Sequence, residues 1–492
     1  MRILKLSLVF TLLINVSVNA QNLCKEVVGY FPNWQWYDRN KVVNPQTIQY
    51  EKYNILNYAF FSPQSDGHII ATDEWADDNL LLGTPIWYPV ETNDFTTSVV
   101  YLAHEANVKI VPSIGGWTLS NNFPSIAADP VKRAVFVNDC MQLIDEYQFD
   151  GIDIDWEYPG FAEHNGTAAD KTNFTILMQD IRDALGSLEI SNGKSYILSA
   201  CFSGDPLKME NIEYGNLIDI LDMFNMMTYD FSGTFDAVAN HNSPLYAPAQ
   251  GDPNWNLDAV FHNLTDVYGV PANKINLGVA FYGRTMTNCA GLFQTHSATG
   301  NTELFAVDEG TPLYYNIVQH LDEFTYNWDD LAKVPYLTNG PDLTFVTYDN
   351  EASIREKGEY IAENNGRGAI IWEITGDYIE TYPGSGIIES TPLVDALNEG
   401  LCSETSVTDV SVQNNDFKIY PNPAKQSTQI YLNTKFRDSY HFRVYNQVGE
   451  LIYSEIIEIG LISWSLKNLE KGVYLIQLDN DKKVFQQKLI VQ

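Results

Sequence analysis

The chain has 492 residues, a length that accommodates a large domain together with a smaller one. Its formal net charge of −34 disfavours a nucleic acid or an anionic membrane surface as a partner, because like charges repel. Aromatic residues make up 13% of the chain, with 10 Trp and 29 Tyr, and such rings can stack on sugars as well as fill a core. A neutral polysaccharide is compatible with this composition.

Residues 1–20 have the pattern of an export signal, with a basic start, a short apolar run and small residues up to Ala20. The run is too short to remain as an anchor, and no later stretch approaches the roughly 20 apolar residues that span a bilayer. We therefore expect an exported protein without a membrane span. Cys24 lacks the small residues immediately before it that a lipoprotein signal carries, so we expect no lipidation.

The five cysteines have no metal-ligand spacing, and no metal site is expected from them. An odd number of cysteines in an exported protein leaves at least one free thiol or an intermolecular pair. Their connectivity does not follow from the sequence. They are Cys24, Cys140, Cys201, Cys289 and Cys402.

Three apolar runs in the first part of the chain predict strands at residues 27–31, 55–61 and 109–117. The third run contains Gly115 and Gly116, and paired glycines let the backbone approach closely where a side chain would clash. Apolar residues at helical spacing then predict a helix over 131–147.

This helix leads into the stretch 149–158, around which the chain is organised. Side chains alternate along an extended strand, so Asp153, Asp155 and Glu157 share one side while the apolar residues between them take the other. Crowded carboxyls repel, so at least one stays protonated near neutral pH and can serve as a general acid. A solvated acidic edge or a calcium loop is the alternative, but the interleaved apolar residues favour a buried strand.

The rest of this region repeats the alternation of strand and helix. We predict a helix over 173–188 and strands at 196–200, 221–230, 275–284 and 368–373, an order that indicates an α/β barrel. About eighty residues separate the last two strands, far more than a short connection needs. They contain a strand-like run at 343–348 and a helix-like run at 354–363.

Residues 150–157 resemble the D-x-x-D-x-D-x-E signature of family 18 glycoside hydrolases, the chitinase family. The S-x-G-G at 113–116 and the M-x-Y-D at 227–230 resemble two further motifs of that family. The resemblance implies a (β/α)8 TIM barrel over residues 24–402, with the signature at the end of its fourth strand. It also implies a small α+β insertion at 285–350, which raises one wall of a deep groove.

The resemblance assigns four catalytic residues. Glu157 protonates the leaving oxygen, and the carbonyl oxygen of the substrate's own N-acetyl group attacks the anomeric carbon, as family 18 enzymes do in place of a second carboxylate. Asp155 stabilises the resulting oxazolinium ion, Asp153 shares a proton with Asp155, and the Tyr229 hydroxyl donates to the acetamido carbonyl. No metal or organic cofactor is implied.

Further positions match the family's substrate-binding residues. Tyr30 and Ser113 are expected to support the innermost carboxylate. Asp150 falls on the opposite side of the strand from Asp153, Asp155 and Glu157, so we expect it to have a structural role. Many relatives have Trp where Phe235 stands, so the grip on the leaving-group side is expected to be weaker. The expected set is Tyr30, Trp34, Ser113, Gly116, Trp117, Met227, Asp230, Phe235, Tyr282, Arg284 and Trp372.

The C-terminal part has another pattern. Residues 403–415 are polar and predict a linker, and short alternating strands over 416–492 predict a small all-β sandwich. Y-P-N-P at 420–423 and G-V-Y-L-I at 472–476 resemble the C-terminal sorting domains of type IX secretion in Gram-negative bacteria. A carbohydrate-binding module is the alternative, but these strands hold one Trp, Trp464, and no evident aromatic platform.

Together these resemblances imply a secreted chitinase that hydrolyses β-1,4-linked N-acetylglucosamine polymers with retention and passes through the periplasm. Its expected partners are chitin or chito-oligosaccharides and the type IX secretion machinery. An endo-β-N-acetylglucosaminidase acting on N-glycans is the main alternative. A chitin-binding lectin is a further alternative, but the acid is typically replaced in such lectins and Glu157 is present here.

Overall fold

The computed structural model describes two compact units, divided between Ser403 and Glu404. Within the described residues, no helix combines the length and the apolarity that a membrane crossing requires. The expected export signal, and the expected linker beyond Ser403, lie outside the described residues. These are residues 23–88, 92–306, 310–403, 417–425, 427–432, 439–446, 451–458, 461–465, 469–480 and 483–492.

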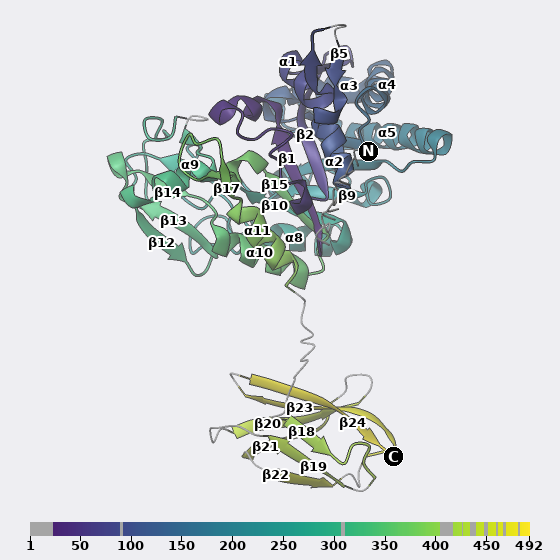
Figure 1. Cartoon of the computed structure of the whole chain (residues 1–492), viewed down its shortest axis with the longest axis vertical. Coiled ribbons are helices and arrows are strands. Elements are labelled where there is room, and N and C mark those ends of the chain that lie inside the picture. The colour runs from purple at the N-terminus through teal and green to yellow at the C-terminus, as the bar shows by residue number, and fades with distance from the viewer. Residues whose placement is uncertain are drawn as a thin grey trace, which may run out of the picture. The chain divides into compact units, whose positions relative to one another are not determined.

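Eight parallel strands of the first unit form a closed barrel within the residues that the structure describes (Figure 1). Each strand pairs with its neighbours in chain order, and the last pairs with the first, so the barrel has no open edge. This confirms the expected barrel. Its strands are β1 (Glu26–Pro32), β2 (Ile55–Pro63), β6 (Lys109–Gly115), β7 (Gly151–Asp155), β8 (Ile197–Ser203), β9 (Met223–Met227), β10 (Ile275–Ala280) and β15 (Gly368–Trp372).

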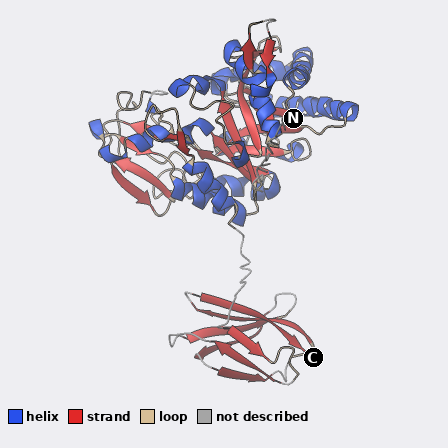
Figure 2. Cartoon of the chain, in the orientation of Figure 1, coloured by secondary structure: helices blue, strands red, loops and turns tan. Residues whose placement is uncertain are grey.

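Helices cover the outside of these strands (Figure 2). The helix α4 shows why one begins where it does: the Asp129 carboxylate caps its start by accepting the Val131 N–H at 2.8 Å, and Pro130 occupies the first turn. The helices are α1 (Glu74–Asp77), α2 (Val99–Glu105), α3 (Phe123–Ala128), α4 (Pro130–Tyr147), α5 (Asp170–Asn192), α6 (Pro206–Met209), α7 (Tyr214–Leu217), α8 (Leu257–His262), α10 (Glu351–Glu363) and α11 (Pro392–Leu401).

Alternation along the strands creates two separate cores. Ile152 and Ile154 of β7 face the layer between barrel and helices, where Trp156 stacks on Phe123 with 5.3 Å between ring centres. Side chains of the opposite parity fill the barrel interior, which contains Asp153 and a second apolar cluster. Successive side chains of this short strand thus alternate between the barrel interior and the helix layer, as the sequence predicts.

Five barrel strands end earlier than expected. The predicted strands 109–117, 149–158, 221–230, 275–284 and 368–373 are observed as β6, β7, β9, β10 and β15, which end at Gly115, Asp155, Met227, Ala280 and Trp372. Asp230 gives one physical reason, because its φ of 60° is a left-handed conformation that no strand adopts. Several expected site residues therefore lie just beyond the strands.

The chain segment that connects β10 to α10 forms an antiparallel sheet in the order β11-β14-β13-β12. Three of its strands, β12, β13 and β14, are labelled in Figure 1. The sheet falls in the region expected as an insertion. A fully buried ion pair follows it, in which Lys357 of α10 lies 2.6 Å from Asp349 and also donates to Ser243 at 2.9 Å. The elements are β11 (Arg284–Met286), α9 (Tyr314–Gln319), β12 (Thr325–Asp329), β13 (Val334–Thr338) and β14 (Phe345–Thr347).

Five more short strands lie in the part of the first unit that the structure describes. The strand β3 extends the barrel sheet at β2, and the other four form two hairpins. They are β3 (Ile69–Ala71), β4 (Thr84–Ile86), β5 (Thr92–Asp94), β16 (Ile379–Glu380) and β17 (Ile388–Ser390).

The described residues of the second unit form two antiparallel sheets, β18-β19-β22 and β21-β20-β23-β24 (Figure 2). Phe442, Ile476 and Leu489 are among the side chains that form its buried core. The expected all-β domain is confirmed. The strands are β18 (Phe417–Tyr420), β19 (Ser427–Leu432), β20 (Ser439–Tyr445), β21 (Leu451–Glu458), β22 (Leu461–Ser465), β23 (Gly472–Asn480) and β24 (Lys483–Val491).

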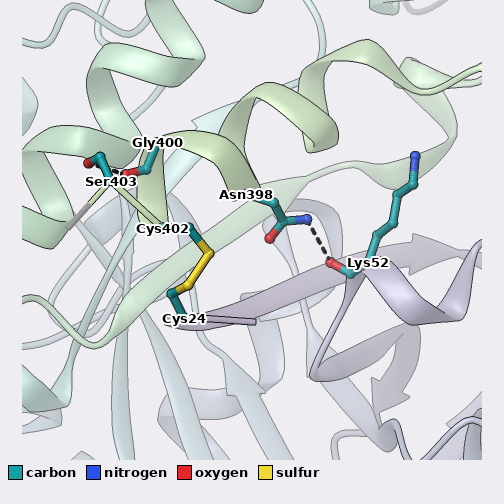
Figure 3. The surroundings of a disulfide bond; sticks show 6 residues. All are labelled: Cys24, Lys52, Asn398, Gly400, Cys402 and Ser403. Carbon is teal, nitrogen blue, oxygen red and sulfur yellow. Dashed lines mark hydrogen bonds between the residues drawn. A yellow bond between two sulfur atoms is a disulfide. The ribbon is translucent and has the colours of Figure 1, made fainter. Parts of the chain in front are cut away.

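A disulfide bond joins Cys24, just before β1, to Cys402, just after α11 (Figure 3). Close by, the Asn398 side chain of α11 donates to the Lys52 carbonyl at 3.3 Å. The bridge spans 378 positions of sequence and fastens the two ends of the barrel unit to each other. The other three cysteines are buried free thiols.

Replacing both bridge cysteines, as Cys24→Ser with Cys402→Ser, should lower the free energy of unfolding by about 3 to 5 kcal/mol, because the unfolded chain regains the entropy that the cross-link removes. Denaturant unfolding followed by tryptophan fluorescence measures this. The Cys289→Ala variant keeps the bridge and serves as the control. Equal unfolding midpoints for wild type and double variant, both without reductant, would contradict a stabilising role of the bridge.

Candidate active site

Asp153 lies at the centre of the barrel with no exposed surface. Its Oδ2 accepts from Tyr30 at 2.9 Å and from Ser113 at 2.8 Å, and its Oδ1 accepts from Ser199 at 2.5 Å and from Asn225 at 3.3 Å. Burial raises the pKa of the Asp153 carboxyl, and these four donors oppose that rise. Four other strands, β1, β6, β8 and β9, thus converge on one carboxyl.

Asp155 is the next inward residue of β7 and is also buried. Its Oδ1 has no hydrogen-bond partner among the described residues. Burial raises the pKa of this carboxyl well above its usual value, and the neighbouring carboxyls of Glu157 and Asp153 raise it further. Burial and mutual repulsion therefore both favour the protonated form of Asp155.

Glu157 lies two residues beyond the end of β7, and its backbone is held on both sides. Its N–H donates to Ser120 Oγ at 2.8 Å, and His164 Nδ1 donates to its carbonyl oxygen at 2.6 Å. Both contacts fix the backbone and leave the carboxyl available for another partner.

Burial raises the pKa of the Glu157 carboxyl to about 7. A hydrogen bond from Tyr158 opposes this rise, the charge of Asp230 adds to it, and the ammonium group of Lys208 opposes it. Lys208 Nζ lies 4.5 Å from the centre of the Tyr158 ring, next to the acid. A carboxyl with a pKa near the ambient pH can both give and take a proton.

Tyr229 and Asp230 lie just beyond the end of β9, after Thr228. Tyr229 is buried, with its ring centre 6.1 Å from that of Tyr282, and burial raises its pKa well above the usual value, so its hydroxyl remains a donor. Asp230 accepts from the Tyr282 hydroxyl at 2.5 Å and from Arg284 Nε at 2.7 Å. Its own N–H donates to Asn242 Oδ1 at 3.0 Å, which holds the left-handed backbone.

Trp372 lies where β15 opens toward this cluster. Its ring stacks on Phe60 at 5.7 Å with 18° between the planes, and the ring centres of Tyr30 and Trp34 lie 5.7 Å and 6.3 Å away. A cavity of about 200 Å³ adjoins these rings. It is lined by Trp34, Gln35, Asp230, Tyr282, Arg284, Thr311, Leu313, Trp372 and Glu373.

Two other aromatic side chains of the expected set are well exposed. Trp117 is 49% exposed and lies beside His164, with 4.5 Å between ring centres. Phe235 is 63% exposed, and the Arg284 guanidinium carbon lies 5.4 Å from its ring centre. Met227, in contrast, belongs to the apolar cluster inside the barrel.

Gly116 has a φ of 92°, a conformation that favours glycine. A Cβ atom built on it would lie 2.7 Å from the Phe60 ring, so a side chain has no room there. Its N–H donates to the Asp155 carbonyl oxygen at 2.7 Å. The S-x-G-G segment therefore holds the end of β7 in place through backbone contact.

The expected residues fall into one connected region around the ends of the strands, with Asp150 apart from them. Asp150 Oδ2 accepts from the Ile110 N–H at 2.9 Å and lies 2.8 Å from His104 Nε2 at the start of β7. Within the described residues, no group of three or more His, Cys, Asp or Glu side chains is arranged to hold a metal ion.

Several residues of this region were not predicted from the sequence. Ser199, Cys201 and Asn225 interrupt the apolar strands β8 and β9 at the inward positions. These residues could have been predicted, because a polar side chain that points into the barrel from a buried strand needs a buried hydrogen-bond partner. No comparable signal marked Ser120, His164 or Lys208.

Residues 26–377 match the family model described as glycosyl hydrolases family 18. The chain belongs to this family. Residues 418–492 match the model of a secretion system C-terminal sorting domain, so the family 18 enzyme carries such a domain as its second unit.

Curated relatives and solved structures agree with this membership. Chitinase A1 of Niallia circulans is 32% identical over 401 residues, which cover 72% of this chain and 57% of the relative. Endochitinase 1 of Metarhizium robertsii is 30% identical over 359 residues, covering 71% of this chain and 80% of that protein. The solved structure of a chitinase from Bacillus thuringiensis matches this family 18 chain with a TM-score of 0.67 and 26% sequence identity. The match covers 95% of this chain and 85% of the chain in that structure.

Replacing Lys208 with Met should raise the pKa of Glu157 above its value of about 7, because the cation that favours the carboxylate is lost. Glu157 then stays protonated to a higher pH. A carbon-13 NMR titration of labelled glutamate carboxyls measures the change, with Glu157→Gln to assign the signal.

Lys171→Met is the matched control, because Lys171 is exposed and its Nζ donates to the Glu210 carbonyl at 2.7 Å rather than facing the acid. A Glu157 pKa that falls or stays constant in Lys208→Met would contradict the electrostatic link.

Proposed function

We propose that this family 18 enzyme is an exported chitinase that hydrolyses β-1,4-linked N-acetylglucosamine polymers with retention of configuration. One observation carries the proposal: Glu157 lies two residues beyond the end of β7, the strand that holds the buried carboxyls of Asp153 and Asp155, and burial raises the pKa of Glu157 to about 7. An acid that is partly protonated at neutral pH can donate to a glycosidic oxygen.

In the proposed reaction, Glu157 gives its proton to the glycosidic oxygen as the bond to the anomeric carbon breaks. The carbonyl oxygen of the substrate's own N-acetyl group forms the new bond to that carbon, so the intermediate is a cyclic oxazolinium ion. Water then attacks the anomeric carbon, gives a proton to Glu157 and opens the ring. Two displacements at one carbon restore its original configuration.

The positive intermediate needs a negative partner and a fixed acetamido group. Asp155 is proposed to accept the acetamido N–H and to stabilise the charge, while the Tyr229 hydroxyl donates to the acetamido oxygen. Asp153 is proposed to share a proton with Asp155. The donors around Asp153 support this role, because they keep that carboxyl in one orientation while its neighbour changes charge.

The aromatic rings of this region support a long linear substrate. Trp34 and Trp372 beside the cavity, and Trp117 beyond the acid, are proposed to stack on successive sugars, with Asp230, Tyr282 and Arg284 as polar contacts. Phe235 is proposed to give a smaller stacking face on the leaving-group side. Four further residues are proposed to line the site or to support its side chains: Gly116, Ser113, Tyr30 and Met227. The names of the relatives, chitinase and endochitinase, support the same substrate class.

The second unit is proposed to direct transport. A sorting domain supports recognition by the type IX secretion machinery in the periplasm and delivery outside the cell or to its surface. The separate core of this unit supports a role independent of hydrolysis.

Glu157→Gln should lower kcat on soluble chito-oligosaccharides by several orders of magnitude, because the amide has no proton to donate to the leaving oxygen, whereas binding of the oligosaccharide should persist. Turnover is measured by chromatography of the products and binding by calorimetry. Glu163→Gln makes the same chemical change at an exposed position and should leave kcat unchanged.

The substrate class is tested with chitin oligomers of several lengths beside an N-linked glycoprotein. Cleavage of the glycoprotein alone would favour an endo-β-N-acetylglucosaminidase. Binding of chitin oligomers with no turnover by the wild type would favour a lectin.

Deleting residues 404–492 should leave kcat and KM on soluble oligomers unchanged, because the deletion keeps the whole barrel unit and its disulfide. In the native host, the truncated protein should accumulate in the periplasm. Kinetic assays measure kcat and KM, and activity assays on cell fractions measure the accumulation in the periplasm. Normal export of the truncated protein would contradict the proposed sorting role, and loss of activity would contradict the independence of the two units.

A further inference from the structure

Arg39 belongs to the segment Asn33–Asn40, which follows β1, and its side chain is only 11% exposed. Its Nη1 donates to the Tyr378 carbonyl oxygen at 2.6 Å, and its Nη2 donates to the Thr375 carbonyl oxygen at 3.0 Å. Both acceptors lie on the segment that follows β15. These two bonds form largely away from water, where a hydrogen bond is strong. Neither the expected site nor the proposed reaction includes Arg39.

The same arginine contacts the inserted region. Its guanidinium carbon lies 3.6 Å from the ring centre of Tyr315 on α9, and the Tyr315 hydroxyl donates to Asp38 Oδ2 at 2.8 Å. This Asp38 oxygen also accepts from Arg39 Nε at 3.1 Å. A guanidinium group has several N–H donors and a planar face, so it can bind carbonyls, a carboxylate and an aromatic ring at once. Arg39 therefore joins three segments that are distant in the sequence.

These three segments also line the cavity of about 200 Å³. Trp34 comes from the segment that carries Arg39, and Leu313 directly precedes α9. Trp372, a third lining residue, is the last residue of β15. Arg39 is not one of the lining residues, so it connects the parts of the cavity wall through contacts outside the lining.

The two indoles beside the cavity belong to a row of ring contacts that starts at Tyr30. The ring centre of Trp372 lies 5.7 Å from that of Tyr30, whose hydroxyl donates to Asp153. The ring centre of Trp34 lies 6.3 Å from that of Trp372. Counted outward from the buried carboxyls, Trp372 is therefore the first indole and Trp34 the next. Trp34 is 43% exposed, so a sugar beyond the one on Trp372 can stack on it.

We propose that Arg39 is a specificity-determining positioning residue, which holds Trp34 beside Trp372 and gives the enzyme a preference for oligosaccharides long enough to reach Trp34. The inference rests on the proposed function. Arg39 touches no sugar and acts through the indole. Its φ of 46° is a left-handed conformation, which persists in a residue with a side chain where the surrounding contacts stabilise it. Loss of the guanidinium contacts therefore releases the segment that carries Trp34.

Arg39→Met removes the guanidinium group and keeps an unbranched side chain. It should lower the ratio of kcat/KM for the hexamer of N-acetylglucosamine to kcat/KM for the trimer by about fivefold, roughly the effect of one lost stacking contact. The variant also loses the cation beside Asp38 and Glu380, so its unfolding temperature should fall. A loss of stability alone would reduce activity on both oligomers equally. A wild type without a preference for the hexamer, or an unchanged ratio in Arg39→Met, would overturn the proposal.

A double-mutant cycle tests whether Arg39 acts through Trp34. Trp34→Ala should lower the same ratio, and adding Arg39→Met to it should have little further effect, because the positioned ring is already absent. If the two substitutions lower the ratio independently, so that their effects multiply, the inference is wrong.

Lys41→Met is the matched control, because Lys41 is a nearby cation whose Nζ lies 3.2 Å from the ring centre of Trp36 rather than on the segment after β15. It should leave the ratio unchanged, and an equal fall would remove the specific role of Arg39. Arg39→Lys keeps the charge without the planar fork and should lower the ratio less than Arg39→Met. This variant decides the question if Arg39→Met does not fold, since an unchanged ratio in Arg39→Lys would also contradict the proposal.

Calorimetry in the Glu157→Gln background measures the same preference without turnover. Arg39→Met should raise the dissociation constant of the hexamer by a larger factor than that of the trimer, and equal factors would overturn the inference. A wild type that binds the oligomers but cleaves none would refute the proposed function. The two dissociation constants would then still decide for or against the role of Arg39.

Discussion

The buried carboxyl of Asp153 is the constraint on which the site depends. An isolated carboxylate in a barrel interior is unfavourable, and the chain compensates with donors from β1, β6, β8 and β9. Each donor fixes the register of its own strand at the level of β7, because a shift by one residue would turn it outward. The hydrogen bonds that stabilise the buried carboxyl therefore also align five of the barrel strands at the end where the site lies.

Shortened strands give the site its shape. Because β7 and β9 end at Asp155 and Met227, the residues that follow are free to leave the pleat, and Asp230 adopts a left-handed φ of 60°. Asn242 and Arg284 then hold Asp230 from segments outside those strands. The barrel supplies rigid positions for the innermost carboxyls, and the loops and the inserted sheet supply the surrounding wall, a division that suits a fold whose loops carry function.

The barrel and the acidic cluster were predictable because both depend on local periodicity. The alternation in 149–158 sorts Asp153 inward and Ile154 outward whatever the rest of the chain does. The disulfide between Cys24 and Cys402 was not predictable, since 378 positions separate the two residues and no local pattern relates them. The strand ends at Asp155 and Met227 were missed for the same reason, because contacts from distant segments override strand propensity there.

Arg284 contacts both Asp230 and Phe235, the position where many relatives were expected to have Trp. Its Nε and Nη2 bind Asp230 at 2.7 Å, while the guanidinium carbon lies 5.4 Å from the Phe235 ring centre. Gly233 allows this approach, because a Cβ atom there would lie 2.6 Å from the Phe235 ring. A phenyl ring offers a sugar less area than an indole, but the cation orients it. The orientation of the Phe235 ring thus depends on the same arginine that binds the Asp230 carboxylate.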